Sequence, residues 1–332
     1  MIAPGFWARR RPGLAARALQ PLGALYGLTT ARRMARPGAR VEAAVVCVGN
    51  FVVGGAGKTP TVIAVARLLR DAGERVAFLS RGYGGAARAE PIEVDPAVHD
   101  AESVGDEPLL LARVAPCFVG ADRVAAARLA IARGASVLAL DDGLQNPSLA
   151  KDLSFAVVDG EAGFGNGLCF PAGPLRAPPA RQSPFVSAAV VIGGGADALA
   201  VFAALAPDKP MFRAALAPDA AVAATLAGRP VLAFAGIARP EKFFATLEAI
   251  GARVAIARRF ADHHRYAPNE VEALIAEAAA RGLTPLTTEK DHVRLAPAYR
   301  RAILALPVTL RFETPAPIAA LLAAALAARR AR

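Results

Sequence analysis

One stretch of the 332-residue chain decides the fold, and it reads Val45-Val46-Cys47-Val48-Gly49-Asn50-Phe51-Val52-Val53-Gly54-Gly55-Ala56-Gly57-Lys58-Thr59-Pro60. Its first four residues are apolar and mostly β-branched, which is typical of a buried parallel strand. Glycines follow, and residues 61–69 then place their apolar side chains along one face of a helix. A strand, a glycine-rich loop and a helix in this order predict a P-loop.

The predicted loop provides groups that can bind the phosphates of a nucleotide. Backbone N–H groups in such a loop surround an anion, and the helix dipole favours negative charge at the same point. We expect Lys58 to reach the β- and γ-phosphates of ATP and the Thr59 hydroxyl to ligate Mg²⁺. The usual spacing would place a further glycine at position 52, where this chain has Val52. The predicted nucleotide contacts are Val52, Val53, Gly54, Gly55, Ala56, Gly57, Lys58 and Thr59.

Two adjacent aspartates follow another apolar run. Residues 136–140 have the pattern of a buried strand, which leads directly into Asp141 and Asp142. Carboxylates at the C-terminal end of a parallel strand lie at the crevice where nucleotides bind, and a P-loop fold places a magnesium-binding aspartate there. Neighbouring strand residues point to opposite faces, so one of the two is expected to face the metal directly. We therefore predict a metal site formed by Thr59, Asp141 and Asp142.

Two clusters could supply the group that takes the proton of an acceptor hydroxyl. Asp262-His263-His264 places an imidazole beside a carboxylate, and Gly105-Asp106-Glu107-Pro108 opens a predicted helix. Acids are also common as ordinary residues in the first turn of a helix, and spacing alone does not choose between the clusters. The base-reading sequence Asn-Lys-x-Asp of guanine-specific P-loop proteins does not occur in this chain, which favours ATP as the nucleotide.

The basic charge of the chain is concentrated at its N-terminus. Its 39 Lys and Arg outnumber its 28 Asp and Glu and give a formal net charge of +11. Residues 1–40 contain eight of the arginines and no acid, so the remaining 31 bases and 28 acids nearly balance. A nucleic-acid partner is therefore not expected. The three widely spaced cysteines predict neither a disulfide framework nor a thiolate metal site, which indicates a reducing compartment.

Residues 1–40 are predicted to form a basic amphipathic arm that associates with a membrane. The leucines, with Trp7 and Tyr26, could share the apolar side of one or two short helices broken near Pro21. The arginines would then contact anionic headgroups, each contributing about 1 kcal/mol. Arg17 and Pro21 interrupt the apolar run, so we expect neither a membrane span nor a cleaved signal peptide. The alternative is a helix that packs its leucines on its own domain.

Seven motifs follow one another in an order that is similar to a known family. They are Asn50 to Pro60, Ser80-Arg81-Gly82-Tyr83-Gly84-Gly85, Gly105-Asp106-Glu107-Pro108, Asp141-Asp142-Gly143-Leu144-Gln145, Pro171-Ala172-Gly173-Pro174-Leu175-Arg176, Phe260-Ala261-Asp262-His263-His264 and Thr288-Glu289-Lys290-Asp291. Together they resemble the tetraacyldisaccharide 4'-kinase family of lipid A biosynthesis, from the arm to about residue 295. The phosphate loop of that family has the double glycine, which is Gly54-Gly55 here, and has no glycine at the position of Val52. The resemblance therefore explains why this chain has Val52 where the usual P-loop spacing has glycine.

The resemblance implies a peripheral enzyme on the cytoplasmic face of the inner membrane. Such an enzyme transfers the γ-phosphate of ATP, with Mg²⁺, to the 4'-hydroxyl of tetraacyldisaccharide 1-phosphate and forms lipid IVA. Its expected partners are the lipid disaccharide and an anionic membrane surface, and no obligate protein partner is evident from the sequence.

The resemblance also implies roles for single residues. Asp106 matches the general base, His263 matches its partner, and Lys58 counts among the catalytic residues. Arg176 matches a residue near the phosphates or the anionic sugar, although Ala177 stands here where the family often has an acid. The remaining residues expected in the substrate pocket are Arg81, Tyr83 and Gln145.

Alternating strand-like and helical stretches predict an α/β fold with two lobes after the arm. A P-loop-type parallel sheet sandwich is expected over residues 41–222 and a smaller α/β lobe over 223–332. A stretch rich in Pro and Ala near 205–228 would join them, and ATP would bind between the lobes and close them. The loop at 160–181 is long and rich in Gly and Pro, which indicates a function beyond connection.

A membrane-recruited P-loop ATPase switch without a small-molecule acceptor is the alternative function. In such a protein the arm would be a targeting helix. Its loop would more often carry a second, signature lysine near the start, and this chain has none there.

Overall fold

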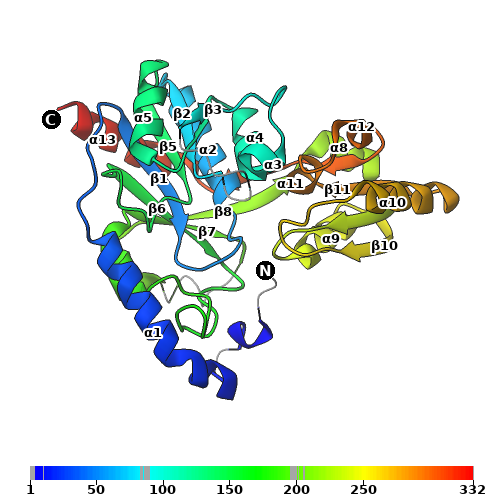
Figure 1. Cartoon of the computed structure of the whole chain (residues 1–332), viewed down its shortest axis with the longest axis horizontal. Helices are drawn as coiled ribbons and strands as arrows, with labels where there is room; N and C mark the ends of the chain where they lie inside the picture. The colour runs from blue at the N-terminus through cyan, green and yellow to red at the C-terminus, as the bar shows by residue number, and fades with distance from the viewer. Residues whose placement is uncertain are drawn as a thin grey trace.

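In the computed structural model, the chain forms two β-sheets with helices packed around them (Figure 1). Within the described part of the chain, the larger sheet has nine strands and the smaller sheet has four. The residues that the structure describes are 4–9, 11–82, 85, 90–194, 200, 202–204 and 206–331.

The larger sheet has the strand of the phosphate loop, β1, at its centre. In spatial order its strands are β13 (Val308–Phe312), β8 (Met211–Pro218), β7 (Ala188–Ile192), β6 (Leu153–Asp159), β1 (Ala44–Asn50), β5 (Val137–Asp141), β2 (Val76–Ser80), β4 (Cys117–Val119) and β3 (Ile92–Glu93). β13 and β3 are antiparallel to their neighbours, and the other pairs are parallel. The carboxyl ends of β1, β5 and β6 therefore meet at one edge of the sheet, as predicted for a nucleotide site.

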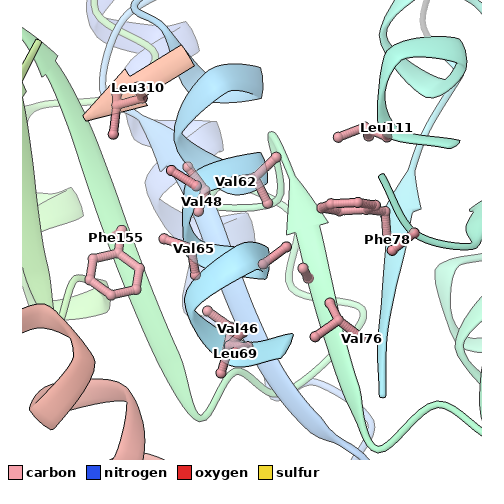
Figure 2. Close-up of a cluster of buried hydrophobic side chains, with 14 of the residues drawn as sticks. Val46, Val48, Val62, Val65, Leu69, Val76, Phe78, Leu111, Phe155 and Leu310 are labelled. Atoms are coloured by element: carbon pink, nitrogen blue, oxygen red, sulfur yellow. The ribbon is translucent and has the colours of Figure 1, made fainter. Parts of the chain in front are cut away.

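Both faces of the larger sheet are covered, which explains why its central strands read as continuous apolar runs. In β1, Val46 and Val48 belong to the core beneath α2, whereas Val45 and Cys47 belong to the core on the opposite face. Figure 2 shows the first core, where Val65 of α2 lies among the side chains of the strands. This alternation fixes β1 between two layers and so fixes where the loop after it emerges.

Helices form the outer layers of the fold. Those outside the smaller lobe are η1 (Gly5–Trp7), α1 (Leu14–Met34), α2 (Lys58–Asp71), α3 (Ala101–Val104), α4 (Asp106–Ala112), α5 (Arg123–Ala132), α6 (Pro179–Gln182), η2 (Ser183–Phe185) and α13 (Pro315–Arg330). Side chains of α2, α4 and α13 share one core, and alanines of α5 lie in the core of the other face. The result is a three-layer α/β sandwich, which confirms the predicted fold class.

The smaller sheet lies beside the larger one and has its own two cores (Figure 1). Its strands, in spatial order, are β10 (Arg253–Arg259), β9 (Pro230–Ala235), β11 (Thr284–Thr288) and β12 (Leu304–Leu306). Its pairs are all parallel among the described residues. The helices of this lobe are α8 (Ala220–Leu226), α9 (Pro240–Ala249), α10 (Pro268–Ala280), α11 (Glu289–His292) and α12 (Pro297–Arg300).

The C-terminal segment does not stay in the smaller lobe, although the sequence predicted that lobe to span 223–332. After β12 the chain returns to the larger sheet, where β13 pairs with β8 and Val308 lies opposite Pro218. α13 then packs against α2 and buries Ile318, Leu322 and Leu326, which are spaced four residues apart. This regular apolar stripe on an alanine-rich helix needs a neighbouring helix to cover it.

α1 is one continuous helix, so the predicted break near Pro21 is wrong. Pro21 is exposed, and water can reach the carbonyl group whose hydrogen bond the proline removes. The helix packs on the protein through small residues such as Gly23 and Gly27, whose added Cβ atoms would lie 2.6 Å and 2.7 Å from atoms of Cys169. Among the described residues, no helix has the length and apolar character that crossing a bilayer requires.

Candidate active site

The phosphate loop runs from the end of β1 to the start of α2 and depends on two glycines in the left-handed region. Gly54 has a φ of 105° and Gly57, directly before α2, has a φ of 83°. A residue with a side chain is strained at such angles. Lys58, the first residue of α2, folds back over the loop, since its Nζ donates a hydrogen bond to the Gly54 carbonyl at 3.1 Å. The loop is therefore curled around the position that the sequence predicts for phosphates.

Asp141 ends β5 and lies beside β1, which brings it to the first turn of α2. The Thr59 hydroxyl donates to its Oδ2 at 3.0 Å, while its Oδ1 is buried without a hydrogen-bond partner among the described residues. Burial, followed by the charge of Glu107, raises the pKa of Asp141 to about 7, against the lowering effect of Lys58. This carboxylate is thus under-satisfied in the structure and favours a nearby cation.

Asp142 has a positive φ of 53°, which turns its side chain toward the loop. Its Oδ2 lies 2.8 Å from Arg176 Nη2 and 3.9 Å from Lys58 Nζ. Burial alone would raise its pKa, but Lys58 and Arg176 hold the pKa of this carboxyl below its usual range. The two aspartates therefore differ, because Asp142 already has cationic partners and Asp141 has a hydroxyl.

The acidic pair and Thr59 fit a magnesium ion. Asp141 Oδ1 and Asp142 Oδ1 are both buried without a hydrogen-bond partner among the described residues, and both are hard oxygen ligands. Mg²⁺ is usually held by one or two carboxylates together with the phosphates of a nucleotide, not by a complete protein cage. The described part of the chain has no group of three or more His, Cys, Asp or Glu arranged to hold a metal.

The loop at 160–181 supports the phosphate loop from the side. Val53 donates its backbone N–H to the Pro174 carbonyl at 2.7 Å. Arg176 donates from Nε to the Val52 carbonyl at 2.9 Å and from Nη1 to Gln145 at 3.3 Å. Arg176 thus joins the loop to Asp142.

Gln145 belongs to a buried amide network beneath the loop. Its side-chain N–H₂ donates to the Asn50 carbonyl at 2.7 Å and to Gln182 at 2.9 Å. In this structure it therefore supports the loop and does not line an open pocket. Arg81 is exposed just after β2. Tyr83 lies outside the described residues.

Asp106 and His263 come from different lobes and meet at the boundary between them. Asp106 begins α4, is 4% exposed, and lies with its Oδ2 3.0 Å from Nδ1 of His263. His263 has a φ of 59°, and its backbone N–H donates to the Gly236 carbonyl at 3.0 Å. The two clusters that the sequence left as alternatives are thus one cluster in space.

Three charged residues that the sequence did not assign also lie in this cluster. Arg294 donates from Nε to Asp106 Oδ2 at 2.7 Å, and Lys290 donates from Nζ to Glu107 Oε1 at 2.9 Å. Burial alone would raise the pKa of Asp106, but the hydrogen bond from His263 and the charges of Lys290 and Arg294 hold it well below its usual range. Glu107 and Lys290 each lie in a motif noted in the sequence, Gly105-Asp106-Glu107-Pro108 and Thr288-Glu289-Lys290-Asp291, whereas no sequence signal marked Arg294.

A phosphate loop on a central parallel strand, an acidic pair at the end of the next strand and a charged cluster across the lobe boundary define a P-loop nucleotide-binding protein. The sequence matches the family described as LpxK, Tetraacyldisaccharide-1-P 4'-kinase, over residues 15–327. The chain belongs to this family.

Named relatives agree with this assignment over nearly the whole chain. A tetraacyldisaccharide 4'-kinase of Methylobacterium sp. strain 4-46 is 57% identical and covers 99% of both chains. One of Methylobacterium nodulans is 55% identical over 99% of this chain and 96% of its own. One of Bradyrhizobium sp. strain BTAi1 is 49% identical over 100% and 97%.

The fold matches a solved structure as well. The crystal structure of an LpxK from Aquifex aeolicus, described as an "apo" form in complex with ATP, superimposes with a TM-score of 0.71. It covers 94% of this chain and 100% of its own, at 24% sequence identity. At this identity the likeness supports the fold.

Proposed function

We propose that this protein transfers the γ-phosphate of ATP to the 4'-hydroxyl of tetraacyldisaccharide 1-phosphate and so forms lipid IVA. The observation that carries the proposal is the 57% identity over 99% of the chain to a protein named for this kinase activity. A membrane-recruited ATPase switch has no support among the relatives, which carry the kinase name.

The phosphate loop and the acidic pair would handle the nucleotide. Backbone N–H groups of residues 54–57 would surround the phosphates, whereas the Val53 N–H is already donated to the Pro174 carbonyl. Lys58 would exchange its contact with the Gly54 carbonyl for phosphate oxygens. Asp141, Asp142 and Thr59 would hold Mg²⁺ with the nucleotide. The ion, when bound, neutralises charge on the phosphate oxygens during transfer. Positioning and charge neutralisation supply most of the rate in this class of reaction.

Asp106 would take the proton of the 4'-hydroxyl, with His263 as its partner. The low pKa of Asp106 keeps it ionised and makes it a weak base. A weak base is sufficient here, because a loose transition state for phosphoryl transfer leaves the hydroxyl proton in place until late. Arg176 would contact the phosphates or the anionic sugar, and Arg81 and Tyr83 would contribute to the substrate pocket. Gln145, predicted from the sequence as a pocket residue, would instead support the phosphate loop from beneath.

α1 would hold the enzyme at the cytoplasmic face of the inner membrane. Leu14, Leu22, Leu25 and Leu28 are 87%, 58%, 61% and 43% exposed, so they do not pack on their own domain as the alternative required. Arginines lie on the same helix, and the combination fits an interfacial helix with anionic headgroups nearby. Such a helix would bring the enzyme to a lipid substrate that lies in the membrane.

The test is transfer of radiolabelled γ-phosphate from ATP to the lipid disaccharide in detergent micelles. We expect Lys58→Ala to abolish transfer, and Asp106→Ala to lower turnover by roughly 100- to 10,000-fold with ATP binding retained. Lys209→Ala, on a turn outside the site, serves as the control lysine and should keep full activity. Release of free phosphate without lipid phosphorylation would contradict the proposed function, and full activity of Asp106→Ala would contradict the assignment of the base.

A further inference from the structure

We propose that Arg294 and Lys290 are positioning residues, which hold the Asp106–His263 pair in its working geometry across the lobe boundary. The proposal rests on the function proposed above. Neither residue is expected to touch the substrate, and each acts through a hydrogen bond to one member of the pair.

Arg294 fixes one oxygen of Asp106. The side chains of Arg294 and Asp106 are 5% and 3% exposed, and Arg294 Nε donates to Asp106 Oδ2 at 2.7 Å. Oδ2 also lies 3.0 Å from His263 Nδ1, so its lone pairs are both engaged. Among the residues that the structure describes, Oδ1 accepts one hydrogen bond, from the backbone N–H of Glu107 at 2.9 Å. Oδ1 therefore has room for the proton of an acceptor hydroxyl, and Arg294 selects it by occupying the other oxygen.

Arg294 is itself held rigidly within the smaller lobe. Its Nη1 donates to the Gly236 carbonyl and to Asp291 Oδ1, each at 2.8 Å. Asp291 is fully buried and also accepts hydrogen bonds from the Gly236 N–H at 3.0 Å and from the Tyr266 hydroxyl at 2.8 Å. A guanidinium with this much support cannot turn away from Asp106 without breaking the network. The strand end of β9 and the helix start of α4 are joined through this one side chain.

Lys290 fixes the hydrogen position on His263. Lys290 Nζ lies 3.4 Å from His263 Nε2 and 2.9 Å from Glu107 Oε1. An ammonium group has hydrogens and no lone pair, so a hydrogen bond from Lys290 needs a lone pair on Nε2. The Asp262 carboxylate also faces Nε2, at the longer distance of 3.9 Å. The hydrogen of the neutral ring then sits on Nδ1, where it is donated to Asp106. Lys290 and Asp106 therefore specify the same tautomer from opposite sides of the ring.

The charges facing Asp106 predict how its titration responds to substitution. His263, Lys290 and Arg294 face it from the smaller lobe, and Glu107 lies next to it on α4. Replacing Arg294 by a neutral residue removes one cation and leaves the effect of burial less opposed, so the pKa of Asp106 rises. A base must be ionised to act, so the low-pH limb of the kcat/KM profile moves to higher pH.

The first experiment measures kcat, KM for ATP and the pH profile of lipid phosphorylation for Arg294→Met and Arg294→Lys. We expect Arg294→Met to lower kcat on the order of 100-fold, to leave KM for ATP within about twofold, and to move the low-pH limb to higher pH. Arg294→Lys keeps the charge and should recover part of kcat and most of the pH profile. Arg300→Met is the matched control, because Arg300 donates only to the carbonyls of Leu295 and Val293 in the same segment.

A pH profile for Arg294→Met that matches the unaltered enzyme, with a loss of stability like that of Arg300→Met, would overturn the positioning role. The second experiment does not depend on that variant. In protein with ¹⁵N-labelled histidine, we expect the His263 resonances to report hydrogen on Nδ1, and Lys290→Met to shift them toward the Nε2–H form. Finding hydrogen on Nε2 in the unaltered protein would refute the role of Lys290. Failure of the proposed function is distinct, since the unaltered enzyme would then transfer no phosphate to the lipid.

Discussion

Replacing Leu22 and Leu25 by serine tests how much of the membrane attachment depends on α1. The two side chains are 58% and 61% exposed, so together they present about the area of 1.2 fully exposed leucines. Burying one leucine side chain contributes about 1.5–3 kcal/mol, so moving both into a bilayer interface contributes about 2–3.5 kcal/mol. Since 1.4 kcal/mol is a factor of ten, the double variant should bind vesicles roughly 30- to 300-fold more weakly.

The assay is co-sedimentation with sucrose-loaded vesicles that contain anionic phospholipid, at low and at high salt. Val98→Ser is the matched control, because Val98 is 77% exposed on a turn outside α1. The melting temperature should stay nearly constant in both variants, because neither substitution touches a core. Vesicle binding of Leu22→Ser/Leu25→Ser within twofold of the unaltered protein would refute insertion of these leucines. Loss of binding at high salt alone would then assign the attachment to the arginines.

Four further expectations follow from single features of the fold. Gly57→Ala should lower the free energy of unfolding by about 1–2 kcal/mol and weaken ATP binding, because Gly57 has a φ of 83° and an added Cβ would meet Ile192. Gly55→Ala is the control and should lower it by less. Leu322→Ala should cost about 2–5 kcal/mol in urea unfolding if α13 belongs to the main core, and a cost below 1 kcal/mol would contradict this packing. Burial lowers the pKa of His292, so as the pH falls the unfolded chain binds a proton on this residue before the folded protein does. The free energy of unfolding therefore decreases as the pH drops below about 6.5, and His292→Gln should make the melting temperature less dependent on pH between pH 7 and 5. Small-angle scattering should show a more compact particle with magnesium and a nonhydrolysable ATP analogue, and identical profiles would speak against closure of the lobes.

The central part of the fold was predictable because its strands are buried on both faces. Continuous apolar runs such as 137–140 need no partner to be recognised as strands. β8 lies in the stretch near 205–228 that was predicted only to join the lobes. Its pattern does not indicate a strand, since only Phe212 and Ala214 are buried and half of its eight residues are alanine or proline, which have low strand propensity. β13 lies in the range 223–332 that was predicted for the smaller lobe, but it pairs in the larger sheet. Its partner is chosen by pairing with a segment about ninety residues away, and local pattern contains no such information.

The residues of the candidate site also differ in whether the sequence could predict their positions. The phosphate loop and Asp141 are local features, because strand, loop and helix place them by sequence spacing alone. Arg294 is one arginine among many in the chain, and nothing adjacent to it indicates that it meets Asp106, 188 positions away. The pairing of His263 with Asp106 was predicted only from the resemblance to the family. In the structure, Nδ1 of His263 lies 3.0 Å from Oδ2 of Asp106.

The way in which the chain enters and leaves the smaller lobe has a mechanical consequence. Residues 219–307 form an insertion whose two ends lie side by side, since Pro218 is paired with Val308 and the Asp219 N–H donates to the Pro307 carbonyl at 2.9 Å. The two crossings are therefore a paired, double-stranded connection, which would resist twisting more than bending. Any swing about it would move His263, Lys290 and Arg294 toward or away from Asp106 as a rigid set. A rotation of the smaller lobe about this connection would thus assemble or separate the cluster around Asp106 in a single motion.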